Sequence, residues 1–359
     1  MKKTATILTI RDYKNHGNRL QNYAVQTVLE KRGCDVVSAD FEGKPCKFGY
    51  MEEIKYRLYA AVGFRVTRHR EYWEQRYAIA SRFKAFNDKY IKSEEINQIS
   101  DLQKRDFYVV GSDQVWNPIW YEYSDIYRHI YLLDFTEPEK RVCMAPSFGT
   151  EDIPEKWKPW FRENLVNFPM LSVREEAGAR IIKELTGREA TVLPDPTMLL
   201  TVEEWRKISH RPRKAKNGYI LTYFLSPKGP DAEACLAEVG EGRRVYRLRD
   251  FTDPVAGSVG PSEFLWLFDH ADLILTDSFH GCVFSFLFNK PFVVFNRNLK
   301  GLNMNSRLDT LLKKFHLERK FASSGLENDI WEHDYSEGYR ILEQEREKAN
   351  DFLNKALRE

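Results

Sequence analysis

The feature that most constrains this chain is an alternation of short apolar runs with amphipathic stretches, which occurs in two successive sets. In the first set we expect strands at 4–10, 34–41, 107–110, 141–145, 171–174 and 191–193, with helices at 17–31 and 175–185. Strands that alternate with helices build parallel sheets covered by helices on both faces. The pattern therefore predicts an α/β fold.

A charged, proline-containing stretch at 207–217 (KISHRPRKAKN) interrupts the pattern and predicts a domain boundary. Beyond it we expect strands at 219–225, 244–248, 273–276 and 292–295, with helices at 232–239, 262–270, 281–288 and 307–315. We predict two Rossmann-like, doubly wound domains that face a cleft, at 1–206 and 218–333. We expect a helical insert at about 44–100, with two helices flanking Gly63, and a final helix at 334–359 that packs back across the domains.

The charge of the chain is segregated. The formal net charge is only +2, but residues 44–92 hold twelve Lys and Arg against five Asp and Glu, which gives +7 there and −5 for the remainder. We expect either a solvated basic helical face or a peripheral contact with anionic membranes at 44–92. Nucleic acid is not expected as a partner, because the rest of the chain is acidic.

The sequence predicts a soluble, cytoplasmic protein, with any membrane association peripheral at the inner face. The apolar run that begins the chain meets Arg11 and Asp12 before a secretory signal is complete, and the longest charge-free apolar run, 278–289, is too short to span a bilayer. Five cysteines without a C-x-x-C pair indicate a reducing compartment. Walker, G-x-G-x-x-G, H-E-x-x-H and D-x-D motifs are absent, so we expect no metal and no cofactor.

Candidate functional residues lie in loops that follow the expected strands, where doubly wound sheets bind ligands. The loop DSFHG precedes a helix, and its Ser278, His280 and Gly281 are placed to bind an anion at the helix N-terminus. Ser278 could instead be only the helix cap, and the His280 ring could bond to local backbone. Arg297 and Lys300 follow the next strand and bring cations to the same rim, unless both are solvated.

Two more loops suggest anion and sugar contacts from the first domain. Arg174 stands at a strand-to-helix turn, where it could clamp a carboxylate or phosphate, or form a salt bridge with Glu175, Glu176 or Asp195. Asp113 could act as a general base toward a hydroxyl, with Trp116 as a platform for a sugar ring. The alternative is an Asx-turn with Trp116 in the core.

The remaining candidates carry amide, imidazole and hydroxyl groups of the kind that bind sugars, although the first five could equally form a helix cap. They are Asn15, His16, Gly17, Asn18, Gln21, Ser112 and Ser147.

With these residues assembled, the chain resembles the polysaccharide pyruvyl transferase family. The resemblance rests on GNRLQNYAVQ (17–26), VVGSDQVWNP (109–118), APSFGT (145–150), SVRE (172–175), LPDPT (193–197) and LTDSFHGCVFSFLFNKPF (275–292), which run through nearly the whole chain. It implies a two-domain fold like that of glycosyltransferase B (GT-B) enzymes, with an acceptor-side first domain and a donor-side second domain.

The resemblance implies transfer of the pyruvate unit of phosphoenolpyruvate to two hydroxyls of a sugar, in cell-surface or capsular polysaccharide biosynthesis. The acceptor sugar would be carried on a nucleotide or a lipid. The family's donor-binding Arg, His and Lys map onto Arg174, His280 and Lys300, with His280 as phosphate contact and acid and Asp113 as base. Many members have Arg-Leu-His-Gly where this chain has Ser278-Phe279-His280-Gly281, so Arg297 or the Ser278 hydroxyl is expected to substitute for that cation.

Two other functions stay open from the sequence. One is a nucleotide-sugar-dependent glycosyltransferase of GT-B architecture, because that fold also places a phosphate at a helix N-terminus of the second domain. The other is a non-catalytic carbohydrate-binding relative that kept the fold and lost the cation at position 278.

Overall fold

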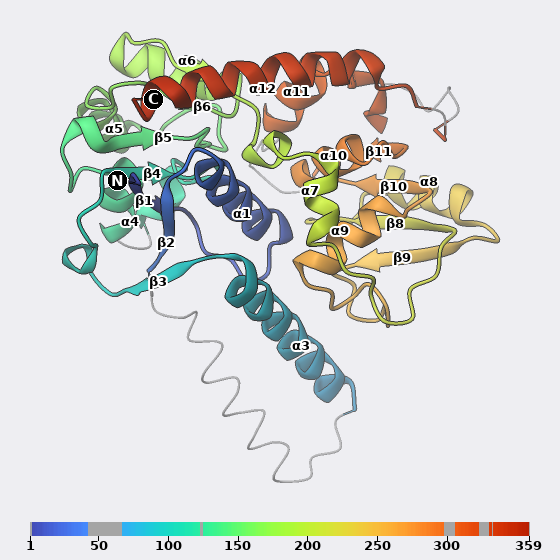
Figure 1. Cartoon of the computed structure of the whole chain (residues 1–359). Helices are drawn as coiled ribbons and strands as arrows, with labels where there is room; N and C mark the ends of the chain where they lie inside the picture. Colours follow the sequence, from blue (N-terminus) through green and yellow to red (C-terminus); the bar gives the residue numbers. More distant parts are fainter. Residues whose placement is uncertain are drawn as a thin grey trace.

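The structure is a computed structural model that describes residues 2–41, 67–122, 125–297, 306–322, 330–331 and 333–358 (Figure 1). Its first sheet has five parallel strands in the order β3-β2-β1-β4-β5, which is the doubly wound order. The strands are β1 (Thr4–Leu8), β2 (Asp35–Phe41), β3 (Ser93–Ile96), β4 (Phe107–Val110) and β5 (Arg141–Cys143).

A parallel pair, β6 (Ser172–Val173) and β7 (Thr191–Val192), lies beside β5. The Ser172 hydroxyl makes this junction, because it donates to the carbonyl of Cys143 at 2.7 Å and accepts from the Ala145 amide at 3.1 Å. The carboxyl ends of β5, β6 and β7 are therefore close together.

The second sheet has four parallel strands in the order β11-β10-β8-β9. They are β8 (Tyr219–Tyr223), β9 (Arg244–Leu248), β10 (Leu273–Thr276) and β11 (Phe292–Val294). Two parallel sheets, each with its strand order reversing about the first strand, confirm the predicted α/β class with two Rossmann-like parts.

The described helices cover these sheets and meet between them (Figure 1). They are α1 (His16–Lys31), α3 (Thr67–Tyr90), α4 (Asp125–Leu132), α5 (Lys158–Leu165), α6 (Glu176–Thr186), α7 (Val202–Lys207), α8 (Pro230–Gly240), α9 (Pro261–Asp269), α10 (Phe279–Leu287), α11 (Ser306–Lys314) and α12 (Ser336–Ala356). A short 3-10 turn, η5 (Pro196–Leu199), follows β7.

Helix α1 illustrates how the sequence sets an element and its ends. The Asn15 side chain caps the helix by accepting from the Asn18 amide at 3.3 Å. Leu20, Ala24 and Val28 recur at four-residue spacing and are buried, which fixes the face that packs on the sheet. Gly33, at φ +75°, ends the helix in a conformation that favours glycine.

The segment expected to be a helical insert is only partly helical. Its residues 67–90 form α3, but Ser93–Ile96 form β3, the edge strand that pairs with β2. The sequence SEEI gave no strand signal because three of its four residues are polar, as suits an exposed edge. The helix expected before Gly63 lies outside the described residues.

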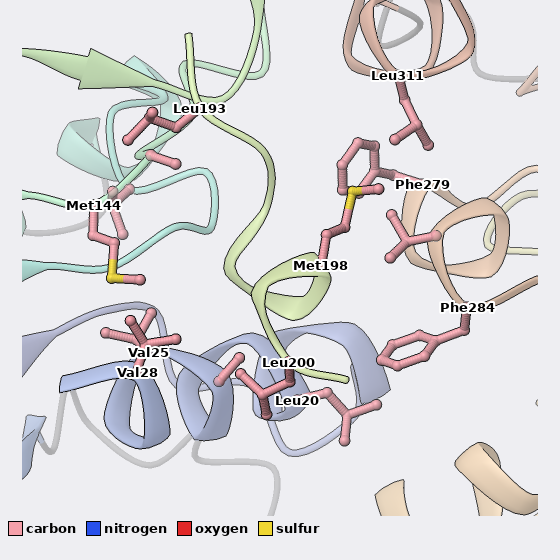
Figure 2. Packing of buried hydrophobic residues seen from close by; sticks show 14 of the residues in the cluster. Leu20, Val25, Val28, Met144, Leu193, Met198, Leu200, Phe279, Phe284 and Leu311 are labelled. Atoms are coloured by element: carbon pink, nitrogen blue, oxygen red, sulfur yellow. The ribbon is translucent and has the colours of Figure 1, made fainter. Parts of the chain in front are cut away.

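One hydrophobic core joins the two halves. Figure 2 shows Leu20 of α1 near Leu200 and shows Met198 of η5 directed toward Phe279 of α10. A separate, smaller cluster packs beneath α8 in the second half. The shared core means that η5, α1 and α10 are held in fixed positions where the halves meet.

Helix α12 returns from the second half to the first (Figure 1). The Arg346 guanidinium donates to the carbonyls of Met198 and Leu200, both at 2.8 Å. Near the end of the chain, the Lys3 ammonium donates to the carbonyl of Leu357 at 2.7 Å. These contacts tie the turn that follows β7 to the helix that ends the chain.

Candidate functional site

The loops at the carboxyl ends of the strands of both halves meet at the carboxylate of Asp195, which follows β7. Its Oδ2 atom accepts from Arg174 Nη1 at 2.5 Å and from Ser112 Oγ at 3.2 Å, and lies 3.6 Å from His280 Nε2. Its Oδ1 atom accepts from the amide and hydroxyl of Thr197 at 2.9 and 2.6 Å. All of these side chains are buried. Asp195 is therefore the counter-ion of an arginine from the first half and also faces a histidine from the second.

Electrostatics hold Asp195 and Arg174 in their charged forms. Burial alone would raise the pKa of the Asp195 carboxyl, but the His280 imidazole and then the Arg174 guanidinium hold it well below its ordinary value. Burial would lower the pKa of Arg174, and the neighbouring carboxylates of Asp195, Asp113 and Glu175 raise it instead. Arg174 and Asp195 therefore remain an ion pair although both side chains are buried.

Asp113 lies next to this cluster, at the end of β4. Its Oδ2 atom accepts from Asn18 Nδ2 at 2.5 Å, and its Oδ1 atom accepts from the Gln114 amide at 2.8 Å. Burial would raise the pKa of Asp113, but the positive charge of Arg174 and the hydrogen bond from Asn18 lower it below its ordinary value. Asp113 is thus held as an ionised carboxylate, and its lowered pKa makes it a weaker base than a free aspartate.

The backbone amides at the N-terminus of α10 are held in place by local contacts. Ser278 caps it, with its hydroxyl accepting from the Gly281 amide at 3.3 Å. Gly281 is required there because a Cβ atom would lie 2.3 Å from the Thr276 hydroxyl. Asp277 accepts from the amides of Leu225 and Ser226 at 2.6 and 2.9 Å, which ties the loop after β8 to the same helix end.

Arg174 keeps hydrogen-bonding capacity that the described residues do not use. Its Nε and Nη2 atoms are buried without a hydrogen-bond partner among these residues. Its guanidinium carbon lies 4.7 Å from the ring centroid of Phe279, the first residue of α10. A buried guanidinium with two idle donors is expected to take a planar anion such as a carboxylate.

Glu175 orients the loop that follows β5. Its Oε1 atom accepts from the Ser147 hydroxyl at 3.0 Å and from the amides of Phe148 and Gly149 at 2.8 and 3.2 Å. The other oxygen, Oε2, is buried with no hydrogen-bond partner among the described residues. The Ser147 hydroxyl, which was expected to contact a sugar, thus makes an internal hydrogen bond in this structure.

Several predicted residues support the site without facing it. Gln21 donates to the Thr9 hydroxyl at 3.0 Å and accepts from the Ser112 amide at 3.2 Å, while Asn15 is occupied as the cap of α1. Arg297 donates from Nε to the carbonyl of Asp277 at 3.2 Å. Lys300 lies outside the described residues.

His16 and Trp116 do not fit the expected contact with a sugar. The His16 Nε2 atom lies 3.0 Å from the carbonyl of Val259, and its ring stacks on Phe264 with centroids 4.8 Å apart. Trp116 is fully buried, packs against Phe148, and donates its indole N–H to the carbonyl of Tyr131 at 2.9 Å. Neither ring face of Trp116 is exposed in this structure, which favours the alternative of a core tryptophan.

Two carboxylates of this cluster, Asp195 and Glu175, were missed as functional candidates from the sequence. So was Arg307, whose guanidinium carbon lies 6.0 Å from the ring centroid of Phe279. Asp195 and Glu175 were considered only as salt-bridge partners of Arg174. Their signal was position, since both directly follow strands that end at the same edge of the sheet. Arg307 had no such signal, because it lies in α11 and reaches the cluster only through tertiary packing.

The described residues contain no group of three or more His, Cys, Asp and Glu side chains that could hold a metal ion. Likewise, none of the helices in the described ranges is both long and apolar enough to cross a membrane.

The fold and the site define a two-part α/β protein of the Rossmann type, with buried cationic and carboxylate groups where the two parts meet. The model of the polysaccharide pyruvyl transferase family matches residues 15–298, and the chain belongs to this family. Membership supports a transferase in polysaccharide biosynthesis. No curated protein matches the chain in sequence.

Solved structures with a similar arrangement include several glycosyltransferases. UGT89C1 of Arabidopsis thaliana complexed with UDP-L-rhamnose is 10% identical, with 99% of this chain and 98% of that chain covered and a TM-score of 0.48. An alpha-glucosyltransferase in complex with UDP and DNA is 11% identical, with 99% and 95% covered and a TM-score of 0.44. A glycosyltransferase from Rickettsia africae is 12% identical, with 99% and 96% covered and a TM-score of 0.43. Likeness at this level says nothing about substrate.

Proposed function

We propose that this chain transfers the pyruvate unit of phosphoenolpyruvate onto two hydroxyls of a sugar to form a pyruvate ketal, in the synthesis of cell-surface or capsular polysaccharide. The observation that carries the proposal is Arg174, which is buried beside the N-terminus of α10 with two donor atoms that no described residue uses. Phosphoenolpyruvate has a carboxylate and a phosphate, so it needs two anion sites. A guanidinium and a helix N-terminus are suited to these groups.

The reaction needs one acid and one base at the donor carbon. A proton is added to C3 of phosphoenolpyruvate, a sugar hydroxyl attacks C2 and loses its proton, the C2–O bond to phosphate breaks, and the second hydroxyl closes the ketal. Of the two protons released, one balances that gained at C3 and the other leaves with the phosphate. We assign His280 as phosphate contact and acid, with Asp195 positioning its ring, and Asp113 as base.

The burial of the site supports a closed state in which water is kept from the reacting carbon. Arg174, Asp195 and His280 come from separate strand ends, so moving the halves apart would separate the histidine from the arginine. We therefore propose that donor and acceptor enter an opened form, with the sugar approaching from Asn18 and Asp113. The acceptor would be linked to a nucleotide or a lipid.

The test is a screen of phosphoenolpyruvate against nucleotide- and lipid-linked hexoses, scored by phosphate release and by mass gain of the acceptor. Arg174→Ala is expected to lose about 2–5 kcal/mol of donor binding by calorimetry, because a desolvated charge pair is removed. The matched control is Arg180→Ala, since Arg180 lies on α6 with its side chain 55% exposed. Stabilisation of the wild type by a UDP-sugar and not by phosphoenolpyruvate would favour a glycosyltransferase instead.

The proposal also places the enzyme in the cytoplasm, with a peripheral membrane contact through residues 44–92. Its support is the net charge of +7 in that segment. In the part of it that the structure describes, Lys84 pairs with Asp88 at 2.7 Å and Lys92 with Glu30 at 2.8 Å, so the attraction would have to come from other basic residues. Co-sedimentation with phosphatidylserine vesicles at low salt is the test, and an unbound protein there would contradict the contact.

A further inference from the structure

We propose that Arg307 is a second anion-binding residue of this site, and that it holds the phosphate of a small dianion whose carboxylate is held by Arg174. The inference rests on the proposed function, which it deepens by dividing the donor between two arginines. Arg307 is the second residue of α11 and belongs to the second half of the chain, like the N-terminus of α10.

The two guanidinium groups share one aromatic ring. The guanidinium carbon of Arg174 lies 4.7 Å from the ring centroid of Phe279, and that of Arg307 lies 6.0 Å from it. Both arginines are at least nine-tenths buried. The two guanidinium groups, which come from different elements, therefore both lie close to the first residue of α10.

The charge around Arg307 favours an anion between the two arginines. Burial, and next the positive charges of Arg174 and Arg297, lower the pKa of Arg307 to about 9, while Glu175 and Asp113 only partly offset this. Asp195 is already engaged by Arg174 at 2.5 Å. Positive charges that are buried together repel one another, and a bound phosphate would relieve that repulsion.

Ser278 and Arg297, the two residues expected to substitute for the missing cation, both make hydrogen bonds within the second half. The Ser278 hydroxyl accepts the cap hydrogen bond of α10, and Arg297 donates its Nε–H to the Asp277 carbonyl. Arg307 is held in place by the docking of α11 on α6, where the Glu176 amide donates to Thr310 Oγ1 at 3.4 Å. We assign Arg307, which carries a positive charge that Ser278 lacks and whose guanidinium carbon lies 6.0 Å from the Phe279 ring centroid, as the residue that supplies this cation.

The experiment measures binding of phosphoenolpyruvate, inorganic phosphate and pyruvate by calorimetry on the full chain. Arg307→Gln is expected to weaken binding of phosphoenolpyruvate and of phosphate about 10- to 100-fold, as loss of a charge-assisted hydrogen bond does, and to leave pyruvate binding unchanged. Arg174→Ala should weaken binding of phosphoenolpyruvate and of pyruvate, and should leave phosphate binding unchanged. Lys313→Gln, an exposed cation on the same helix, is the control and should leave all three affinities at the wild-type value.

The outcomes of this experiment distinguish failure of the Arg307 assignment from failure of the proposed transfer reaction. Wild-type phosphate affinity in a folded Arg307→Gln variant overturns the assignment of Arg307 and leaves the transfer reaction untouched. A wild type that binds phosphate but not phosphoenolpyruvate, with phosphate binding lost in Arg307→Gln, supports the anion site and contradicts the proposed function. If the Gln variant does not fold, Arg307→Lys is measured instead. Lysine keeps the charge but cannot bind two oxygens of one group, so phosphate affinity should fall several-fold, and an unchanged affinity overturns the assignment.

Discussion

The imidazole of His280 lies directly against Gly17, the second residue of α1. A Cβ atom at position 17 would lie 2.1 Å from His280 Nδ1 and 2.2 Å from the ring carbon Cγ. The contact joins two helix N-termini, one from each half of the chain, and it leaves the Nε2 side of the ring toward Asp195. The absence of a side chain at Gly17 is what lets the histidine reach Asp195, the carboxylate that also accepts from Arg174.

The first prediction is that Gly17→Ala lowers activity far more than stability. The added methyl group must push the His280 ring aside, and a displacement of about 1 Å at a reacting group can cost about 100-fold in rate. Alanine also favours a helix over glycine by about 1 kcal/mol, which partly offsets the clash in the free energy of unfolding. Phosphate release should fall about 100-fold while urea unfolding stays close to wild type.

The control for this variant is Gly229→Ala, because nothing lies within 4 Å of a Cβ atom at that position. That variant should keep full activity. A Gly17→Ala protein with normal turnover would show that the approach of His280 to α1 is not needed for the reaction.

The second prediction concerns Asp195, the counter-ion of Arg174. Asp195→Asn removes the charge that faces Arg174 and His280 in a site from which water is excluded. Leaving a buried guanidinium uncompensated should lower the free energy of unfolding by about 3–5 kcal/mol. Asp88→Asn, in the exposed pair with Lys84, should show no measurable loss in the same urea titration. Equal stabilities for the two variants would contradict a role for Asp195 as counter-ion.

The third prediction is a pH dependence of stability set by His16. Burial is the main cause that lowers the pKa of His16 to about 4, against about 6.5 in the unfolded chain. Between these values the unfolded chain holds the proton and the folded chain does not, so stability rises with pH across this window and is lost as pH falls from 6.5 toward 4. The loss attributable to His16 should be roughly 3 kcal/mol.

His16→Gln tests this dependence, because it keeps a donor near the carbonyl of Val259 without a titrating group. The free energy of unfolding should change less between pH 6.5 and 4 in this variant than in the wild type. Identical pH profiles for the two proteins would place the acid sensitivity elsewhere.

The sequence was sufficient to predict the helices and strands whose ends carry local signals. It was insufficient for features whose position is decided by tertiary packing. The cap at Asn15 and the positive φ at Gly33 bound α1 close to where the pattern placed it. Strand β3 was not predicted from the sequence, because its residues are mostly polar and it pairs only through its backbone at the edge of the sheet. The same division holds in the site. The loop of His280 was visible as a strand-to-helix junction, whereas Asp195 was expected only as one of three possible salt-bridge partners of Arg174, because its other neighbours are brought to it by tertiary packing.

The last prediction separates a core tryptophan from a sugar platform at position 116. Trp116 is fully buried between Phe148 and Phe168, so Trp116→Ala should leave a large cavity and cost about 3–5 kcal/mol of unfolding free energy. Ile119→Ala, nearby in the chain and 43% exposed, should cost far less in the same titration. For the fraction of Trp116→Ala protein that folds, the KM for the acceptor should match the wild type. A raised acceptor KM with unchanged stability would mean that the ring contacts the sugar after all.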